Sequence, residues 1–493
     1  MSHRVFVKLL GSALVCCLSW SLFGCTSEAA KPASSPETQP ATASAEHAAQ
    51  AKNVILMIAD GAGFNTWRAG AMYRGRLGKE VYDGEGWVHL GCTTYPLTLS
   101  KSATGKNTQD EKVVYDPAKA WDPENGYKWL KSTATDSAAS GTALATGVKT
   151  YNSAINWTDT DEPMTGKTLP EIAHKLGKRA GVITSVEFSH ATPATLGGAH
   201  NPSRNAYEKI ATEMLAADYL DVIMGAGHPA FDDNGNPKEK ITEGNYKYVG
   251  GKAVWDQLVA GTHPNGWTLV QTKEEFESLT TGKTPARVVG TAQVATTLQQ
   301  KRGGIVGGLA RQEPFAAPMN QNVPSLATMT KGALNCLDDD PDGFFLMVEG
   351  GAVDWANHAN QEHRMLEEYD DFMKAVEAVV EWVETNSSWD ETLLILTADH
   401  DCGLPWGPDS AEKPFQPIVD NGPGKMPGLH YNAGGHSNML VPVFAKGVGS
   451  ELLLQCVRGR DAHAAEVWEF SGDYIDNTDI NRTIVTVLGG DSP

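Results

Sequence analysis

The chain has 493 residues, of which 41% are hydrophobic and 20% are charged, as is typical of a large globular protein. Its formal net charge is −20 at pH 7. This charge argues against nucleic acid as a binding partner, and it requires any phosphate site to carry its own local positive charge.

The first 25 residues predict an export signal that is not part of the fold. Arg4 and Lys8 precede the apolar run Leu9–Phe23, which is too short to form a stable transmembrane helix. The segment ends in Leu-Phe-Gly-Cys25, which is similar to the processing site of bacterial lipoproteins. We therefore expect an exported, periplasmic protein, anchored to the outer membrane only by a lipid on Cys25. The alternative is an ordinary signal peptide that is cleaved nearby.

Residues 26–51 are rich in Ala, Ser, Thr, Pro and Glu, and this composition predicts a flexible tether. Residues 52–490 predict one domain, because the candidate site residues extend from Asp60 to His436. Outside the export segment, four cysteines allow three disulfide pairings, which stay open. They are Cys92, Cys336, Cys402 and Cys456.

Predicted strands and helices alternate along the domain. Apolar runs predict strands within 53–63 and over 181–187, 221–225, 343–349, 392–399 and, as the final strand, 440–445. Helical spacing occurs over 168–179, 207–217, 361–385 and 479–488. The alternation predicts an α/β fold, a three-layer α/β/α sandwich with a large, mostly parallel sheet and a site at the C-terminal ends of its strands. Insertions are expected near 107–127, 229–303 and 406–432.

Ser137 begins a predicted helix that is rich in Ala, Thr, Leu and Gly and extends to Gly147. Free backbone N–H groups and the helix dipole make such an N-terminus a suitable place for a phosphate and for an oxygen that attacks it. The alternative is a simple N-cap serine.

Acidic and histidine side chains lie at or near the ends of the predicted strands, with spacings that suit metal ions. Asp354 and His358 are four residues apart, so a helix would place them on one face. Asp399 and His400 would be costly to bury after an apolar strand without partners. The other candidates of this kind are Asp60, His190, Glu349 and His436, and the hydroxyl of Thr192 lies two residues after His190.

These motifs resemble those of the alkaline phosphatase family and follow one another in the same order as in the family. They cover the chain from residue 52 to about residue 447. The most diagnostic stretch is Asp136-Ser137-Ala-Ala-Ser-Gly-Thr-Ala. The matching segments are Asn53–Gly63, Thr135–Thr150, His190–Pro193 through Arg204, Val348–His358, Thr397–His400 and Gly435–Gly447.

The resemblance implies a role for each matching residue. Ser137 would be the nucleophile that becomes a phosphoserine, Arg204 would clamp the phosphate, and Asp136 would orient Arg204. Zinc takes His and carboxylate ligands, and magnesium prefers oxygen ligands. The implied ligands are Asp354, His358 and His436 for a first zinc, Asp60, Asp399 and His400 for a second zinc, and Asp60, Thr192 and Glu349 for one magnesium.

Two positions depart from the best-known bacterial pattern of the family. His190 replaces an aspartate and Trp355 replaces a lysine. Family members with His and Trp at these places depend visibly on added magnesium. We therefore expect His190 to lie just outside the magnesium shell and Trp355 to form a wall of the pocket.

The resemblance thus implies hydrolysis of small phosphate monoesters by a protein that is commonly a homodimer. A phosphodiesterase of the same superfamily is an alternative, although such enzymes usually lack the magnesium ligands and the clamp arginine. Sulfatases need a Cys/Ser-x-Pro-x-Arg context, which Ser137 does not have. From a different class, the chain could be an exported, non-catalytic protein that binds metal or phosphate.

Overall fold

The computed structural model of the chain describes residues 50–303 and 312–490. The predicted export segment 1–25 with Cys25, and residues 26–49 of the predicted tether, lie outside the described residues. Within the described ranges, none of the helices combines the length and the apolar character needed to cross a membrane. All four cysteines of the described part are free thiols, so none of the three pairings is formed.

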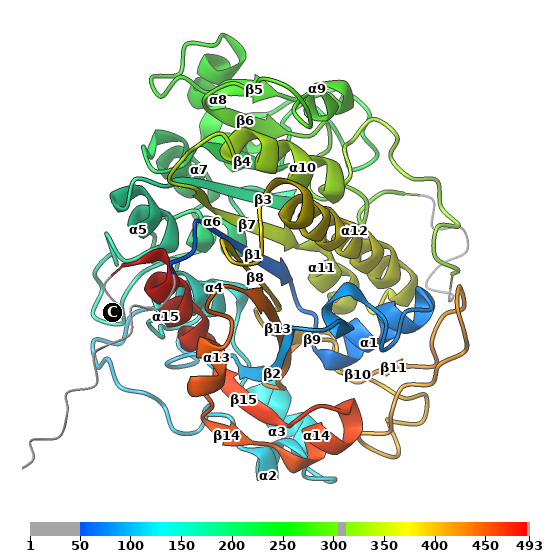
Figure 1. Cartoon of the computed structure of the whole chain (residues 1–493). Coiled ribbons are helices and arrows are strands. Elements are labelled where there is room, and N and C mark those ends of the chain that lie inside the picture. Colours follow the sequence, from blue (N-terminus) through cyan, green and yellow to red (C-terminus); the bar gives the residue numbers. More distant parts are fainter. Residues whose placement is uncertain (1–49, 304–311, 491–493) are drawn as a thin grey trace, which may run out of the picture. The chain divides into compact units, whose positions relative to one another are not determined.

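An eleven-stranded sheet forms the centre of the domain (Figure 1). The seven neighbouring strands from β8 to β5 are parallel, and β13 runs antiparallel to both of its neighbours. The strand order is β14 (Gly459–Arg460), β15 (Asp473–Asp476), β2 (Val88–Thr93), β13 (Val441–Gly447), β8 (Thr392–Thr397), β1 (Asn53–Ala59), β7 (Phe344–Gly350), β3 (Arg179–Glu187), β4 (Val222–Ala226), β6 (Val288–Thr291) and β5 (Thr268–Val270).

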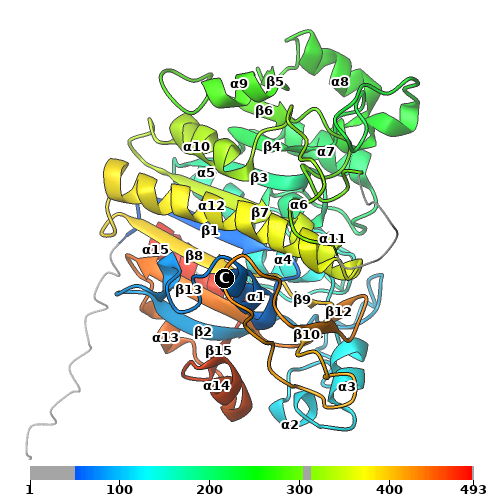
Figure 2. The same cartoon turned by 90° about the vertical axis from the view of Figure 1, so that its right-hand side faces the viewer.

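Helices cover both faces of the sheet, which confirms the predicted three-layer fold. On one face lie α10 (Leu326–Leu337) and the long α12 (Glu362–Asn386), which crosses in front of the strands in Figure 2. On the other face lie α5 (Leu169–Lys175), α6 (Ala191–Leu196) and α15 (Asn477–Leu488). Every residue of β1 and β7 is buried, and burial on both faces explains why these strands are continuous apolar runs.

The remaining elements are short or lie around the sheet. The helices are α1 (Phe64–Tyr73), η1 (Val81–Asp83), α2 (Pro117–Ala120), α3 (Gly126–Ser132), α4 (Ser137–Thr146), α7 (Tyr207–Ala216), η2 (Glu243–Val249), α8 (Gly251–Val259), α9 (Lys273–Ser278), α11 (Ala352–His358), α13 (Leu452–Gln455) and α14 (Ala462–Trp468). Two small antiparallel pairs are formed by β9 (Asp401–Cys402) with β12 (His436–Ser437), and by β10 (Pro405–Trp406) with β11 (His430–Tyr431).

The prediction that 440–445 is the final strand is wrong. It forms β13, but β14 and β15 follow it and extend the sheet beyond β2. These two strands have only 2 and 4 residues, too few for a periodic pattern to be recognised. The segment 229–303, expected as an insertion, contributes β5 and β6 to the opposite end of the sheet.

Part of the polar segment 107–127 packs into a second apolar cluster. Tyr115 and Trp121 are buried there together with Trp406 and Trp468. The Tyr115 hydroxyl and the Trp121 Nε1–H both donate to the Asp461 carboxylate, at 2.6 and 2.8 Å. These buried aromatic side chains attach the segment to the C-terminal part of the domain.

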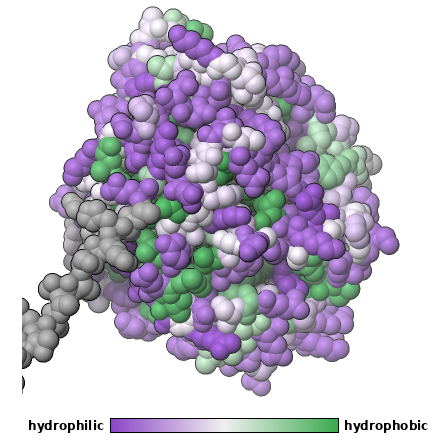
Figure 3. Space-filling view, viewed as in Figure 1, coloured by the Kyte–Doolittle hydropathy of each residue, from purple (hydrophilic) through white to green (hydrophobic). Residues whose placement is uncertain are grey.

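The molecular face seen in Figure 3 is mostly hydrophilic, with apolar residues in separate small patches. Singly exposed apolar side chains are normal for protein surfaces.

Candidate active site

Four adjacent strands bring the predicted ligands to one edge of the sheet. Asp60 follows β1, Glu349 is the second-to-last residue of β7, and Asp399 and His400 follow β8. The register aligns Ile58 with both Glu349 and Thr397, so these three strands end at the same level. The fourth strand, β3, is followed by His190 and then by Thr192 on α6.

Ser137 is the first residue of α4, but it does not cap the helix. The cap is Asp136, whose carboxylate accepts the Ala139 N–H at 3.0 Å. The Ser137 side chain is only 2% exposed, and its Oγ lies 3.1 Å from His400 Nε2. The N-cap alternative for Ser137 is therefore wrong, and its hydroxyl faces the group of predicted metal ligands.

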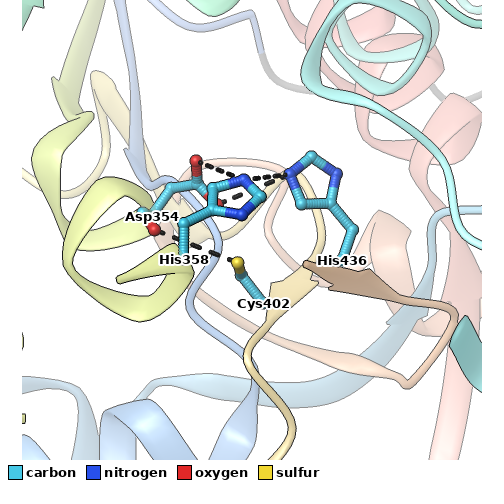
Figure 4. A group of neighbouring side chains, drawn as sticks. All are labelled: Asp354, His358, Cys402 and His436. Carbon is cyan, nitrogen blue, oxygen red and sulfur yellow. Dashed lines mark hydrogen bonds and ion pairs between the residues drawn. The ribbon is translucent and has the colours of Figure 1, made fainter. Parts of the chain in front are cut away.

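Asp354, His358 and His436 form one group of side chains (Figure 4). The two histidine Nε2 atoms lie 3.4 and 3.6 Å from oxygens of Asp354 and 3.0 Å from each other. Each Nδ1 faces a backbone carbonyl, Gly434 for His358 at 3.0 Å and Thr135 for His436 at 2.9 Å. These contacts fix the rings so that both Nε2 atoms can bind a cation.

Asp60, Asp399 and His400 form a second group beneath Ser137. His400 Nε2 lies 3.1 Å from Asp399 Oδ2 and 3.7 Å from Asp60 Oδ1. Asp399 is oriented by the N–H groups of Gly61 and His400, which donate to its other oxygen. An oxygen of Asp354 also lies within 4.8 Å of the ligand atoms of Asp60 and His400, so Asp354 stands between the two groups.

A third group consists of Glu349 and Thr192, with His190 beside them. The Thr192 hydroxyl and Glu349 Oε1 are buried without a hydrogen-bond partner in the described part of the chain, whereas Thr184 donates to Glu349 Oε2. Both oxygens of Asp60 are also buried without a hydrogen bond. Buried oxygens without partners are costly, so this donor set fits a hard cation.

The electrostatics of the site favour positive ligands. Burial, followed by the charges of Asp399 and Asp354, raises the pKa of Asp60 well above its usual value. Burial also raises the pKa of Glu349 to about 7. Burial and the guanidinium of Arg204 lower the pKa of His190 to about 3, so its imidazole is neutral. Among the described residues, no lysine or arginine forms an ion pair with Asp60 or Glu349. The negative charge of these buried carboxylates is therefore available to a cation.

Arg204 reaches the same site from the loop between α6 and α7. Its Nη1 donates to Asp136 Oδ2 at 3.1 Å, and its Nη2 lies 3.5 Å from His190 Nε2. Asp136 therefore both caps α4 and forms an ion pair with Arg204. The His190 ring lies 5.6 Å from Trp355 in an edge-on contact.

One pocket of about 760 Å³ opens onto Ser137, Arg204 and the group formed by Asp354, His358 and His436. The structure thus brings every predicted site residue of the described chain to this end of the sheet, while their individual roles stay predictions. The residues that line the pocket are Ser137, His190, Arg204, Gln300, Lys301, Arg302, Asp354, Trp355, His358, Ala359, Gln361 and His436.

Sequence reasoning missed Cys402 and the segment 300–302. The Cys402 Sγ lies within 4.8 Å of ligand atoms of Asp354, His358 and His436, and points toward them in Figure 4. Its position two residues after His400 was the available signal, since a thiolate is a good ligand for zinc. Segment 300–302 carried no comparable signal, because its place in the pocket depends on tertiary packing.

A buried serine beside carboxylates and histidines that suit cations, at the edge of a three-layer α/β sheet, defines a metal-binding hydrolase. The family model "Alkaline phosphatase" matches residues 51–412. The chain therefore belongs to the alkaline phosphatase family, and it is a phosphatase.

Individual relatives agree with this assignment. Alkaline phosphatase 4 of Bacillus subtilis is 31% identical over 402 residues, which cover 80% of this chain and 70% of the relative. Alkaline phosphatase of Escherichia coli is 29% identical, with 71% and 70% covered. A His-to-Asp mutant of the alkaline phosphatase TAB5, solved with Mg bound in its M3 site, matches in fold with a TM-score of 0.55 and 22% identity, with 90% and 99% covered.

The raised pKa of Glu349 predicts how the stability of the metal-free protein depends on pH. The folded state holds a proton on this carboxyl between its usual pKa of 4.5 and about 7, so stability from this group is lost as pH rises through that interval. Glu349→Gln should remove this loss, which amounts to about 3 kcal/mol at about 1.4 kcal/mol per pKa unit. Urea unfolding of chelator-treated protein at both ends of the interval measures it.

The exposed Glu239 provides the matched control, since Glu239→Gln should leave the pH dependence of the wild type intact. An equal loss of stability with rising pH in wild type and Glu349→Gln would contradict the electrostatic account of this carboxyl.

Proposed function

We propose that the chain hydrolyses phosphate monoesters through a phosphoserine intermediate on Ser137, releasing inorganic phosphate and an alcohol. The observation that carries the proposal is the position of the Ser137 hydroxyl. It is free of a capping role and lies 3.1 Å from His400 Nε2, within a pocket that also holds Arg204.

The donor sets fit two zinc ions and one magnesium ion. Histidine and carboxylate groups suit zinc, and the carboxylate and hydroxyl oxygens of the third group suit magnesium. When bound, these cations would stabilise negative charge on the attacking and departing oxygens. Their holders would be Asp354, His358 and His436, then Asp60, Asp399 and His400, and finally Asp60, Thr192 and Glu349.

The residues of the chain have distinct tasks in this reaction. The guanidinium of Arg204, held by Asp136, would hydrogen-bond two oxygens of the phosphoryl group and orient it. The Ser137 hydroxyl would give its proton to solvent as Oγ bonds to phosphorus. The bond to the leaving group would break at the same time, and the departing alkoxide would take a proton from water. Water would then cleave the phosphoserine and restore the Ser137 hydroxyl.

Two alternatives make different use of the same site. A phosphodiesterase of the superfamily would not need the donor set of Thr192 and Glu349 or the clamp of Arg204, and both features are present here. An exported, non-catalytic binder of metal or phosphate would not need a serine hydroxyl, without a capping role, among the ligands. The donor set, the arginine and the serine hydroxyl therefore favour monoester hydrolysis.

Export, lipid attachment at Cys25 and a homodimer complete the proposal. The basis for export is the charged start, the short apolar run and the final Cys25 of the first segment. Replacement Cys25→Ser should move the protein from the outer-membrane fraction to the soluble periplasm. Recovery of the variant in the membrane fraction at the wild-type level would contradict lipid attachment.

The proposed homodimer is tested separately, because light scattering of the tether-free domain measures its oligomeric state.

Ser137→Ala should lower the turnover of p-nitrophenyl phosphate by about three orders of magnitude or more, because the covalent route is lost. Mass spectrometry of wild type quenched during turnover should detect a phosphoryl group on the peptide containing Ser137. Ser132→Ala, which changes the exposed last residue of α3, is the matched control and should keep wild-type turnover.

Full activity of Ser137→Ala would contradict the assignment of the nucleophile. Bis(p-nitrophenyl) phosphate, offered in parallel, distinguishes the diesterase alternative, for which it would be the faster substrate. No turnover of either ester by the metal-loaded wild type would favour the non-catalytic binder.

His190 predicts weak retention of magnesium. Its neutral imidazole adds no negative charge to the third group, so dialysis should remove magnesium and activity, and added magnesium should restore both. His190→Asp should tighten magnesium binding about tenfold, as measured by equilibrium dialysis. Asparagine has the shape of aspartate without its charge, so His190→Asn should not tighten magnesium binding. Complete retention of magnesium by dialysed wild type would contradict this prediction.

A further inference from the structure

One side of the pocket consists of residues that belong to none of the predicted metal or phosphate groups. Gln300, Lys301 and Arg302 face it from the segment that follows β6, together with Gln361 at the start of α12. The volume of about 760 Å³ is within the range of pockets that hold whole small molecules, and it is much larger than a phosphoryl group needs. This side is therefore available to the leaving group of the substrate.

The backbone around Lys301 is fixed by its neighbours. Gln300 Nε2 donates to Gln361 Oε1 at 3.0 Å, and the Lys301 N–H donates to Thr297 Oγ1 at 2.9 Å. Arg302 is 2% exposed and forms an ion pair with Glu367 at 2.7 Å. Lys301 is thus an exposed residue on an anchored segment.

The Lys301 ammonium lies against the wall formed by Trp355. Its Nζ is 5.2 Å from the centre of the indole ring, within the range of a cation–π contact. Trp355 directly follows Asp354 on α11, so this wall adjoins the group that contains His358 and His436. The contact places a positive charge on the side of the pocket that adjoins this group.

Of the lysine and arginine side chains that line the pocket, Lys301 is the one without a carboxylate partner among the described residues. Arg204 is paired with Asp136 and Arg302 with Glu367. Within residues 50–303 and 312–490, Lys301 has no carboxylate partner at ion-pair distance. On a protein with a net charge of −20, an unpaired ammonium at the pocket is a local exception that an anion can use.

We propose that Lys301 and Trp355 form a binding site for a second anionic group, carried by the leaving group of the substrate. The favoured substrates are then phosphate monoesters whose alcohol bears a carboxylate or another phosphate. This inference rests on the proposed function, because it concerns the alcohol side of the same pocket.

The test compares phenyl phosphate with 4-carboxyphenyl phosphate on the zinc- and magnesium-loaded protein. The readout is the ratio of kcat/KM for the carboxylated ester to kcat/KM for the plain ester. Lys301→Met should lower this ratio about fivefold, the size expected of one partly exposed ion pair. Lys301→Glu should lower it further, Lys301→Arg should keep it, and added salt should weaken the preference of the wild type.

Lys331→Met is the matched control, because Lys331 is an exposed lysine paired with Glu381 away from the pocket, and its ratio should equal that of the wild type. Turnover of phenyl phosphate with the same ratio in wild type, Lys301→Met and Lys301→Glu would overturn the anion site and leave the proposed function standing. Absence of turnover with both esters in the wild type would overturn both.

Discussion

Four carboxylates, those of Asp60, Glu349, Asp354 and Asp399, meet at one buried edge of the sheet. The rest of the site depends on how their negative charge is neutralised. Each is at most 4% exposed. Burial of like charges without partners costs several kcal/mol per group. Burial raises the pKa of Asp60 and of Glu349, whereas the neighbouring histidines lower the pKa of Asp354 and of Asp399. Cations relieve the cost of burial, so the fold and the metal chemistry are linked through these four side chains.

The groups around the carboxylates keep them oriented toward the serine. Backbone carbonyls of Thr135 and Gly434 hold the rings of His436 and His358, and backbone N–H groups hold Asp399. Asp136 connects Ser137 with Arg204, because it caps the helix that begins at Ser137 and also forms an ion pair with Arg204. The Ser137 hydroxyl is thereby left without a capping role, and Arg204 lines the same pocket as Ser137.

Much of this arrangement could be predicted from the sequence, because buried parallel strands are continuous apolar runs and their ends carry unusual polar residues. Asp60 and the Asp399–His400 pair were recognisable for that reason. The short strands β14 and β15 contain too few residues for a pattern, and Lys301 approaches the site only through tertiary packing. No periodicity within a segment contains that information, because it depends on which distant elements become neighbours.

The central claim is that cations gather around Ser137 at the carboxylate edge. Anomalous diffraction at the zinc absorption edge, from crystals grown with zinc and magnesium, tests it most directly. The account predicts two strong zinc peaks, one among Asp354, His358 and His436 and one among Asp60, Asp399 and His400. Zinc peaks only at surface positions, with none within coordination distance of these six residues, would contradict it.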